Sequence, residues 1–204
     1  MNLHNSYYYF KSALGEKFCD EVVKYAKSKK DQPGVTGEQS KKPKKSLNDL
    51  KKLRDSNVVW LNDTWIYNEI HPWIHEANKR SGWNFDWNYS ESCQFTKYKT
   101  NQFYDWHCDS WRFPYDTPND INTHGKIRKL SVTCTLSDEK DYKGGELEFQ
   151  FRNQDDPTLT QTCTEILPRG SIVVFPSFVW HRVKPVTKGT RYSLVIWNLG
   201  YPFK

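Results

Sequence analysis

The chain of 204 residues lacks a long apolar run and a paired arrangement of cysteines. It contains no run of roughly 18 apolar residues, so no membrane span is predicted. Residues Met1–Ser6 show no basic region followed by an apolar one, so we expect no secretory signal. The five cysteines are odd in number, widely spaced and without a Cys-x-x-Cys pair. We therefore expect reduced thiols and a cytoplasmic or other reducing intracellular compartment.

Aliphatic residues are also few, but aromatic residues are abundant. The chain has 9 Trp, 12 Tyr and 11 Phe, or 16% of all residues. Aromatic rings bury large areas and are frequent in strands, so this composition predicts a folded, β-rich protein and argues against disorder. A chain of this length is expected to form one domain with a substantial core.

The net charge of +6 is concentrated in one segment. From Lys27 to Arg54 there are ten Lys or Arg and three acidic residues, a balance of +7, so the rest of the chain carries about −1. Residues 31–45 contain Pro and Gly and show no apolar period, so we expect a mobile basic loop over residues 31–50. Two interpretations remain open, a solvated loop or a loop that contacts an acidic or phosphorylated partner.

Apolar spacing predicts helices early in the chain and strands later. One helix is expected over residues 15–30 and a second from about residue 63 to Gly82, which Pro72 should bend or split. A strand is expected at Asn57–Leu61. The strands predicted after Gly82 are Trp83–Ser90, Ser92–Tyr98, Tyr104–Asp109, Lys126–Leu136, Glu146–Phe151, Gln161–Leu167, Ser171–Phe175 and Thr190–Asn198.

These short strands, which helices rarely interrupt, favour a particular class of fold. They indicate a mainly β (α+β) protein with an antiparallel sandwich or barrel, not a βαβ arrangement. We expect a single domain over residues 1–204. Residues 1–82 would form a helical support that includes the basic loop, and residues 83–204 would form the β core.

Three side chains suggest a metal site. His107 and Asp109 stand two positions apart on a predicted strand, so both should point to the same face. His181 follows 72 positions after Asp109. Two histidines and one carboxylate form the facial set that leaves open positions on non-haem Fe(II). Cys108 should point to the opposite face and is not expected to be a ligand. His71 and His75, one helical turn apart, have no third ligand beside them and should pack or lie at the surface.

A charged residue in the last predicted strand indicates an anionic ligand. Arg191 lies ten positions after His181 in an apolar segment. Its planar, permanently charged fork suits a carboxylate, and burial without such a partner would be costly. The sequence therefore implies either a bound anion or an Asp or Glu partner. Ser193 shares the face of Arg191 and can add a hydrogen bond. Trp197 lies on the same face. Its side chain could form a wall of the site or pack in the core, and the sequence leaves both roles open.

The order and spacing of His107, Asp109, His181 and Arg191 resemble the Fe(II)/2-oxoglutarate-dependent dioxygenases, specifically the prolyl 4-hydroxylase-like branch. The matching features run from about Arg54 to Tyr201. They also include Tyr98 and the segment Gly144–Leu147. The resemblance implies a double-stranded β-helix (jelly roll) with supporting N-terminal helices.

The resemblance also implies roles for the individual residues. His107, Asp109 and His181 would hold Fe(II), and no catalytic residue beyond the metal and co-substrate ligands is expected. The residues implied in 2-oxoglutarate binding are Arg191, Tyr98, Ser193 and Thr135.

Substrate contacts are implied on two sides of the site. Arg54, in Arg54–Ser56, resembles the Arg-x-Ser that follows the substrate loop of prolyl hydroxylases, so Gln32–Leu50 would be a lid. Trp111 and Trp197 are expected to form part of an aromatic rim near the substrate. Trp106, Phe113 and Tyr115, which lie near Trp111 in the sequence, could belong to the same rim or pack in the core.

The predicted activity is hydroxylation of a C–H bond, with a prolyl residue of a peptide or protein as the expected substrate. Fe(II) would be the metal, 2-oxoglutarate and O2 the co-substrates, and succinate and CO2 the co-products; ascorbate is allowed as a further cofactor. One alternative is oxidative demethylation of nucleic acid on the same scaffold. Another is a non-catalytic, metal-binding jelly-roll module.

Overall fold

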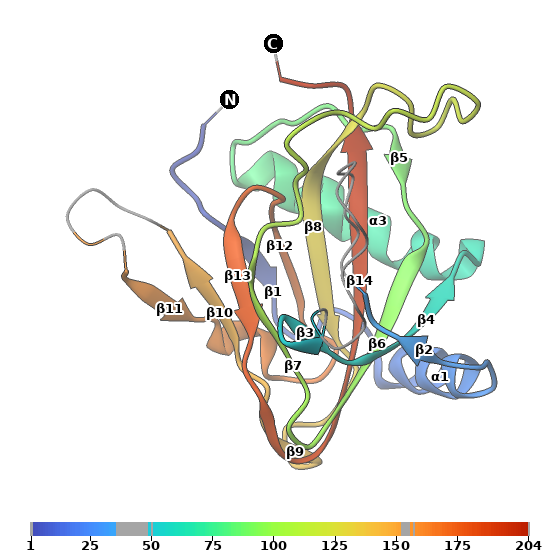
Figure 1. Cartoon of the computed structure of the whole chain (residues 1–204), viewed down its shortest axis with the longest axis vertical. Coiled ribbons are helices and arrows are strands. Elements are labelled where there is room, and N and C mark those ends of the chain that lie inside the picture. Colours follow the sequence, from blue (N-terminus) through green and yellow to red (C-terminus); the bar gives the residue numbers. More distant parts are fainter. Residues whose placement is uncertain (1, 36–48, 50, 152–155, 157, 204) are drawn as a thin grey trace.

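The computed structural model describes residues 2–35, 49, 51–151, 156 and 158–203, drawn in colour in Figure 1. Most of the predicted basic loop at 31–50, and with it most of the proposed lid Gln32–Leu50, lies outside the described residues. Within the described part, no helix has both the length and the apolar composition needed to cross a membrane. All five cysteines are described, and none forms a disulfide.

Two antiparallel sheets face each other, as expected for a jelly roll (Figure 1). In the described residues the major sheet has nine strands and the minor sheet has five. The major sheet runs in the order β1 (Tyr8–Phe10), β12 (Ile172–Pro176), β8 (Ile127–Thr135), β14 (Val186–Gly200), β6 (Cys93–Lys99), β4 (Asn57–Leu61) and β2 (Gln32–Pro33), with β5 (Tyr89–Ser90) and β9 (Tyr142–Gly144) also paired to β14. The minor sheet runs β11 (Thr160–Thr162), β10 (Leu147–Gln150), β13 (Trp180–Val183), β7 (Phe103–His107) and β3 (Arg54–Asp55).

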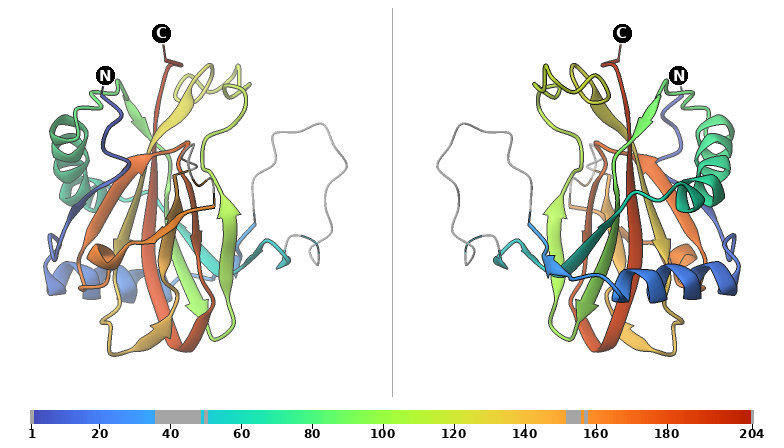
Figure 2. Two further views of the ribbon diagram at one scale, coloured as in Figure 1. Left: turned by 90° about the vertical axis from the view of Figure 1, so that its left-hand side faces the viewer. Right: turned by 90° about the vertical axis from the view of Figure 1, so that its right-hand side faces the viewer.

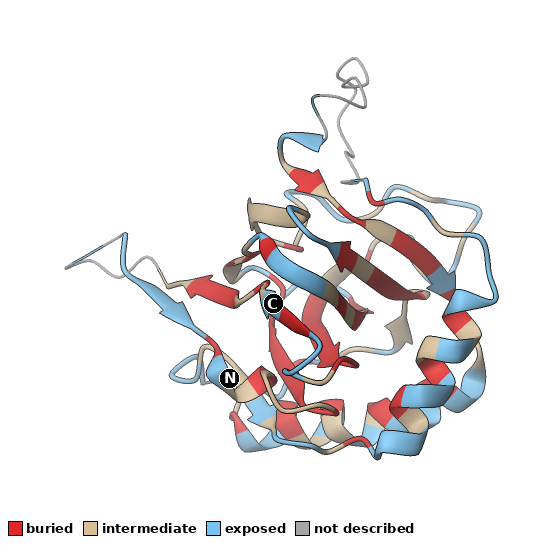
Figure 3. Cartoon of the chain, turned by 90° about the horizontal axis from the view of Figure 1, so that it is seen from below, coloured by how far each residue is buried: buried red, intermediate tan, exposed pale blue. Residues whose placement is uncertain are grey.

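Two helices, α1 (Glu16–Lys27) and α3 (Thr64–Arg80), cover the outer face of the major sheet (Figure 2). The main core lies between them and the sheet, because apolar residues of α3 such as Ile66, Ile70 and Ile74 are fully buried there. Figure 3 shows this burial on the strands and on the sheet-facing sides of the helices. The mainly β jelly roll with supporting helices is therefore confirmed.

Alternation along β8 and β14 separates the core from the inner face of the major sheet. On β8, Val132 and Cys134 belong to the core beneath the helices, and so does Leu194 on β14. The intervening residues face the minor sheet. They include polar residues such as Thr133 and Arg191, so the space between the sheets is chemically different from the core.

Several predicted elements differ from the structure. Helix α3 continues through Pro72 and is not split, with fully buried Ile70 and Ile74 on either side of the proline. Of the predicted strand Trp83–Ser90, only β5 pairs. The earlier part is a loop because the Asn78 side chain takes both backbone hydrogen bonds of Phe85, at 3.0 and 2.9 Å.

Other differences concern short elements of both sheets. The predicted strand Gln161–Leu167 divides into β11 and the 3₁₀ helix η1 (Thr164–Ile166). Strands β1, β2, β3, β9 and β13 were not predicted. All five have only two to four residues, too few for an alternating pattern to be recognised.

Candidate metal centre and anion pocket

His107, Asp109 and His181 converge between the two sheets. His107 ends β7, and its direct partner across the ladder on β13 is His181. The Oδ1 atom of Asp109 lies 3.8 Å from His107 Nε2, and its Oδ2 atom lies 3.6 Å from His181 Nε2. One ligand atom from each residue falls within 4.8 Å of the other two, so a single metal ion could be bound by all three.

Asp109 reaches this cluster from a turn, not from the strand that the spacing predicted. Strand β7 ends at His107, and the chain then folds toward the β12–β13 turn. There the backbone N–H groups of Asp109 and Ser110 both donate to the carbonyl of Ser177, each at 2.9 Å. The prediction that both side chains converge is confirmed, but the reason given for it was wrong for Asp109. Cys108 contacts the carbonyl of Ser110 and lies outside the cluster, as expected.

Hydrogen bonds orient both imidazole rings toward the cluster. The Nδ1 atoms of His107 and His181 lie 2.7 and 3.0 Å from the backbone carbonyls of Asp105 and Val179. A carbonyl can only accept, so each Nδ1 must carry the proton. Each Nε2 therefore presents a lone pair to a metal.

Electrostatics favours the protonation states that metal binding requires. Burial, reinforced by neighbouring His181, lowers the pKa of His107 to about 3, so its ring is neutral at pH 7. Burial alone would raise the pKa of Asp109, but His181, His107 and Arg128 outweigh it and hold that pKa below its usual value. The cluster thus combines neutral imidazole with carboxylate.

The His107 ring is held from behind by a stack of side chains. Tyr104 stacks on it with ring centroids 3.5 Å apart, and the guanidinium of Arg54 lies 4.6 Å from the centre of the Tyr104 ring. Arg54 is only 3% exposed and donates to Ser56 at 2.9 Å. The structure therefore places Arg54 in a supporting layer behind the cluster. Its predicted contact with substrate stays a prediction.

A second feature of the same cavity is a buried arginine without an acidic partner. Arg191 is 2% exposed and lines the cavity that also contains the His107–Asp109–His181 cluster. Its Nη1 donates to Ser193 at 3.3 Å, and no described Asp or Glu forms an ion pair with it. The sequence left a bound anion and an acidic partner open, and no described residue is such an acidic partner.

Polar groups near Arg191 complete this anion pocket. Tyr98 is directly opposite Arg191 in the β6–β14 ladder and is 3% exposed. Thr135 is opposite Ser193 in the β8–β14 ladder, and its buried hydroxyl has no hydrogen-bond partner among the described residues. All four residues predicted for co-substrate binding therefore lie on adjacent strands.

The sequence did not reveal Arg128 and Glu91, which lie beside Trp197 of the cavity wall. Leu130 pairs with Asn198 and Arg128 pairs with Leu199, so Lys129 is an extra residue that forms a β-bulge. A bulge changes the direction of neighbouring side chains. Arg128 consequently lies 4.0 Å from the centre of the Trp197 ring and forms a two-bond ion pair with Glu91. Nothing in the sequence marks this bulge.

The predicted aromatic rim is only partly assembled. Trp197 lines the cavity, and Trp111 lies on the other side of Arg128, 5.4 Å from its guanidinium. Tyr115 links Trp111 to Glu91 through hydrogen bonds of 2.9 and 2.7 Å. Phe113 is 67% exposed, and Trp106 packs beneath Arg182.

The histidines of α3 pack away from this rim. His71 lies 3.0 Å from Ser90, and His75 stacks on Trp87. Neither belongs to the metal cluster found among the described residues, so both have the packing role that the sequence predicted.

Two arginine substitutions should affect stability differently in the ligand-free protein. Arg191→Met removes a buried charge with no described acidic partner, so we expect the free energy of unfolding to stay the same or rise. Arg128→Met leaves Glu91 without its partner, so we expect a loss of about 3 kcal/mol. Denaturant unfolding of both variants measures this. Equal losses would show that Arg191 is paired within the protein.

Comparisons with known proteins agree with this geometry. The family model of the 2OG-Fe(II) oxygenase superfamily matches residues 93–198, slightly more than half of the chain. A PKHD-type hydroxylase of Synechococcus sp. (strain CC9902) is 40% identical over 99 residues, which cover 48% of this chain and 36% of that protein. A PKHD-type hydroxylase of Pseudomonas fluorescens is 37% identical over 102 residues, which cover 50% and 40%. The matched segment thus spans little more than a third of these relatives.

Solved structures show the same fold over nearly the whole chain. A prolyl-4-hydroxylase from Pseudomonas putida has a TM-score of 0.66 at 17% identity and covers 96% of this chain and 92% of its own. A prolyl hydroxylase from Trichoplax adhaerens has a TM-score of 0.70 at 17% identity and covers 96% and 84%. The family model and the conserved geometry of the fold together lead to one conclusion: the chain belongs to the 2OG-Fe(II) oxygenase superfamily, with the fold of its prolyl 4-hydroxylase-like branch.

Proposed function

We propose that the protein is an Fe(II)- and 2-oxoglutarate-dependent dioxygenase that hydroxylates a prolyl residue of a peptide or protein. One observation carries this proposal. A cluster of two histidines and one carboxylate and a buried arginine without a described acidic partner open into the same cavity. The cluster suits a metal with open coordination positions, and the arginine suits a carboxylate.

The donor set fits Fe(II). His107, Asp109 and His181 would bind it through the two Nε2 atoms and a carboxylate oxygen, and the remaining positions would face the cavity. Backbone carbonyls fix both histidine tautomers, and Tyr104 holds the His107 ring in place. Bound Fe(II), with 2-oxoglutarate and O2, supplies the oxidising chemistry that yields succinate, CO2 and a hydroxylated product.

The pocket around Arg191 fits the far carboxylate of 2-oxoglutarate. The guanidinium can donate two parallel hydrogen bonds, and Ser193 lies beside it at 3.3 Å. The Thr135 hydroxyl, buried without a described partner, would be satisfied by the same carboxylate. Tyr98 lies next to Arg191, with its ring centre 5.7 Å from the guanidinium carbon, and would close the pocket. An anion there would compensate a charge that is otherwise costly to bury.

Aromatic side chains at the mouth support a ring-shaped substrate group. Trp197 lines the cavity. The ring centroid of Trp60 lies 6.2 Å from that of Trp197, and Trp60 is 43% exposed. Flat rings of this kind can pack against a prolyl ring. The relatives are called PKHD-type hydroxylases, and the Trichoplax structure is a complex with a peptide fragment. These names support a peptide or protein substrate.

We further propose that residues 1–204 act as one domain. Helices α1 and α3 pack on the outer face of the same sheet whose inner face carries Arg191 and Thr135. Separating residues 1–82 would expose that core, so the helical support and the β core should fold together.

Removal of single ligands tests the metal centre. His107→Ala, Asp109→Ala and His181→Ala should each abolish detectable Fe(II) binding while the fold is kept, because each removes one of only three protein ligands. His75→Ala is the matched control, since that histidine stacks on Trp87 outside the cluster. Calorimetric metal titration and circular dichroism measure both properties. A ligand variant with wild-type Fe(II) affinity would show that the residue is not a ligand.

Proline-containing peptides test the substrate. With Fe(II), 2-oxoglutarate and O2, we expect a peptide to gain the mass of one oxygen atom at proline and to release an equal amount of succinate. Trp197→Ala should lower this coupled hydroxylation while 2-oxoglutarate turnover without peptide persists, because Trp197 stands on the substrate side. Trp65→Ala, on the surface of α3, is the control.

Two outcomes would contradict different parts of the proposal. Succinate formation with no peptide modified across a broad proline library would exclude the prolyl substrate but keep the dioxygenase. No iron-dependent succinate formation under any condition would instead favour a non-catalytic binding module.

A further inference from the structure

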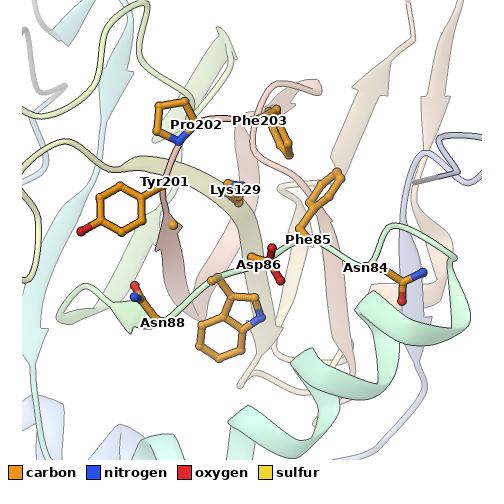
Figure 4. A pocket seen from close by; sticks show the side chains of 10 residues that line it. Asn84, Phe85, Asp86, Asn88, Lys129, Tyr201, Pro202 and Phe203 are labelled. Atoms are coloured by element: carbon orange, nitrogen blue, oxygen red, sulfur yellow. The ribbon is translucent and has the colours of Figure 1, made fainter.

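A second cavity lies at the end of the molecule where both termini emerge, apart from the metal cluster (Figures 1 and 4). Its walls come from the loop Asn84–Asn88 and from Gly200–Phe203, and Lys129 of β8 lines it as well. Figure 4 shows Lys129 and Asp86 near the centre, with the rings of Phe85, Tyr201 and Phe203 around them. None of these residues takes part in the proposed dioxygenase site.

Lys129 is buried to an unusual degree for a lysine. It is only 5% exposed, and no described carbonyl, hydroxyl or carboxylate accepts a hydrogen bond from its ammonium group. Its charge contacts the face of Phe203, with Nζ 4.3 Å from the ring centre. A cation–π contact does not supply the hydrogen-bond acceptors that an ammonium group can use. Burial lowers the pKa of Lys129, which is consistent with this deficit.

The origin of this burial is the β-bulge in β8. Lys129 is the extra residue between Arg128 and Leu130, so it has no direct partner on β14. Its carbonyl instead accepts a hydrogen bond from the backbone N–H of Ser177 at 3.0 Å. Released from the regular ladder, the Lys129 side chain enters the cavity.

Asp86 provides the opposite charge at the rim. It lines the same cavity, is exposed, and acts on Lys129 electrostatically by raising its pKa. The two groups nevertheless form no ion pair within 4.0 Å in the described structure. A simple anion would be attracted by Lys129 and repelled by Asp86. A ligand with both charges would satisfy the two groups at once.

We propose that this cavity binds a free α-amino acid with an apolar side chain. The carboxylate of the amino acid would accept hydrogen bonds from Lys129 at the inner end, and its ammonium group would face Asp86 at the rim. The apolar side chain would pack against the rings of Phe85, Phe203 and Tyr201. The proposal is independent of the dioxygenase function, because it uses none of the residues of that site.

Ligand chemistry provides the first test and needs no mutation. In calorimetric titrations of the wild-type protein, L-phenylalanine or L-leucine should bind at millimolar concentrations or below. L-Phenylalaninamide, which lacks the carboxylate, and N-acetyl-L-phenylalanine, which lacks the ammonium group, should bind more weakly by about tenfold or more. No binding of either amino acid, or binding of either derivative as tight as that of L-phenylalanine, would overturn the proposal.

Matched substitutions provide the second test. Lys129→Met keeps the apolar stem and removes the charge, so L-phenylalanine affinity should fall by about tenfold or more. Asp86→Asn should weaken it by a smaller factor, because an exposed charge is screened by solvent. Lys17→Met is the control, because it removes a lysine from the exposed surface of α1. This variant should bind L-phenylalanine as the wild type does. Unchanged affinity in Lys129→Met, with a melting temperature that confirms folding, would contradict the assignment.

Discussion

The antiparallel pairing of β7 with β13 is the constraint on which the candidate site depends. It places His181 directly opposite His107, although the two residues are far apart in the sequence. The same end of β7 releases the chain into the turn that brings Asp109 beside both histidines. A shift of the register by one residue would turn one histidine to the other face of the sheet, so no metal could be held.

Each of the two cavities contains a buried positive charge. Arg128 is paired with Glu91, and this pair needs nothing further to be stable. Arg191 and Lys129 are 2% and 5% exposed, and no described carboxylate forms an ion pair with either. A buried charge without a partner is costly, so a ligand that supplies the complementary group would stabilise each of these two positions. The same physical argument, applied to Arg191 and to Lys129, leads us to infer a ligand in each of the two cavities.

The sequence predicted the fold class and most of the site because these depend on local patterns. Arg191 and Ser193, for example, stand two positions apart on one strand, a spacing that places both side chains on the same face. The turn that carries Asp109 depends on a contact with Ser177, nearly 70 residues later, so spacing alone could not reveal it. The position of Arg128 depends on one extra residue in a ladder, and such a bulge leaves no mark in a single sequence.

Titration of 2-oxoglutarate into the Mn(II)-loaded or Fe(II)-loaded protein without oxygen tests the central claim, that the metal cluster and Arg191 form one site. Arg191→Ala should weaken 2-oxoglutarate binding by about 2–5 kcal/mol while metal affinity stays near the wild-type value, because only the far carboxylate loses its partner. Arg191→Lys should be milder, and Arg182→Ala, a half-buried arginine that is paired with Glu148 and does not line the cavity, should leave 2-oxoglutarate affinity unchanged. Unchanged 2-oxoglutarate affinity in Arg191→Ala would contradict the account.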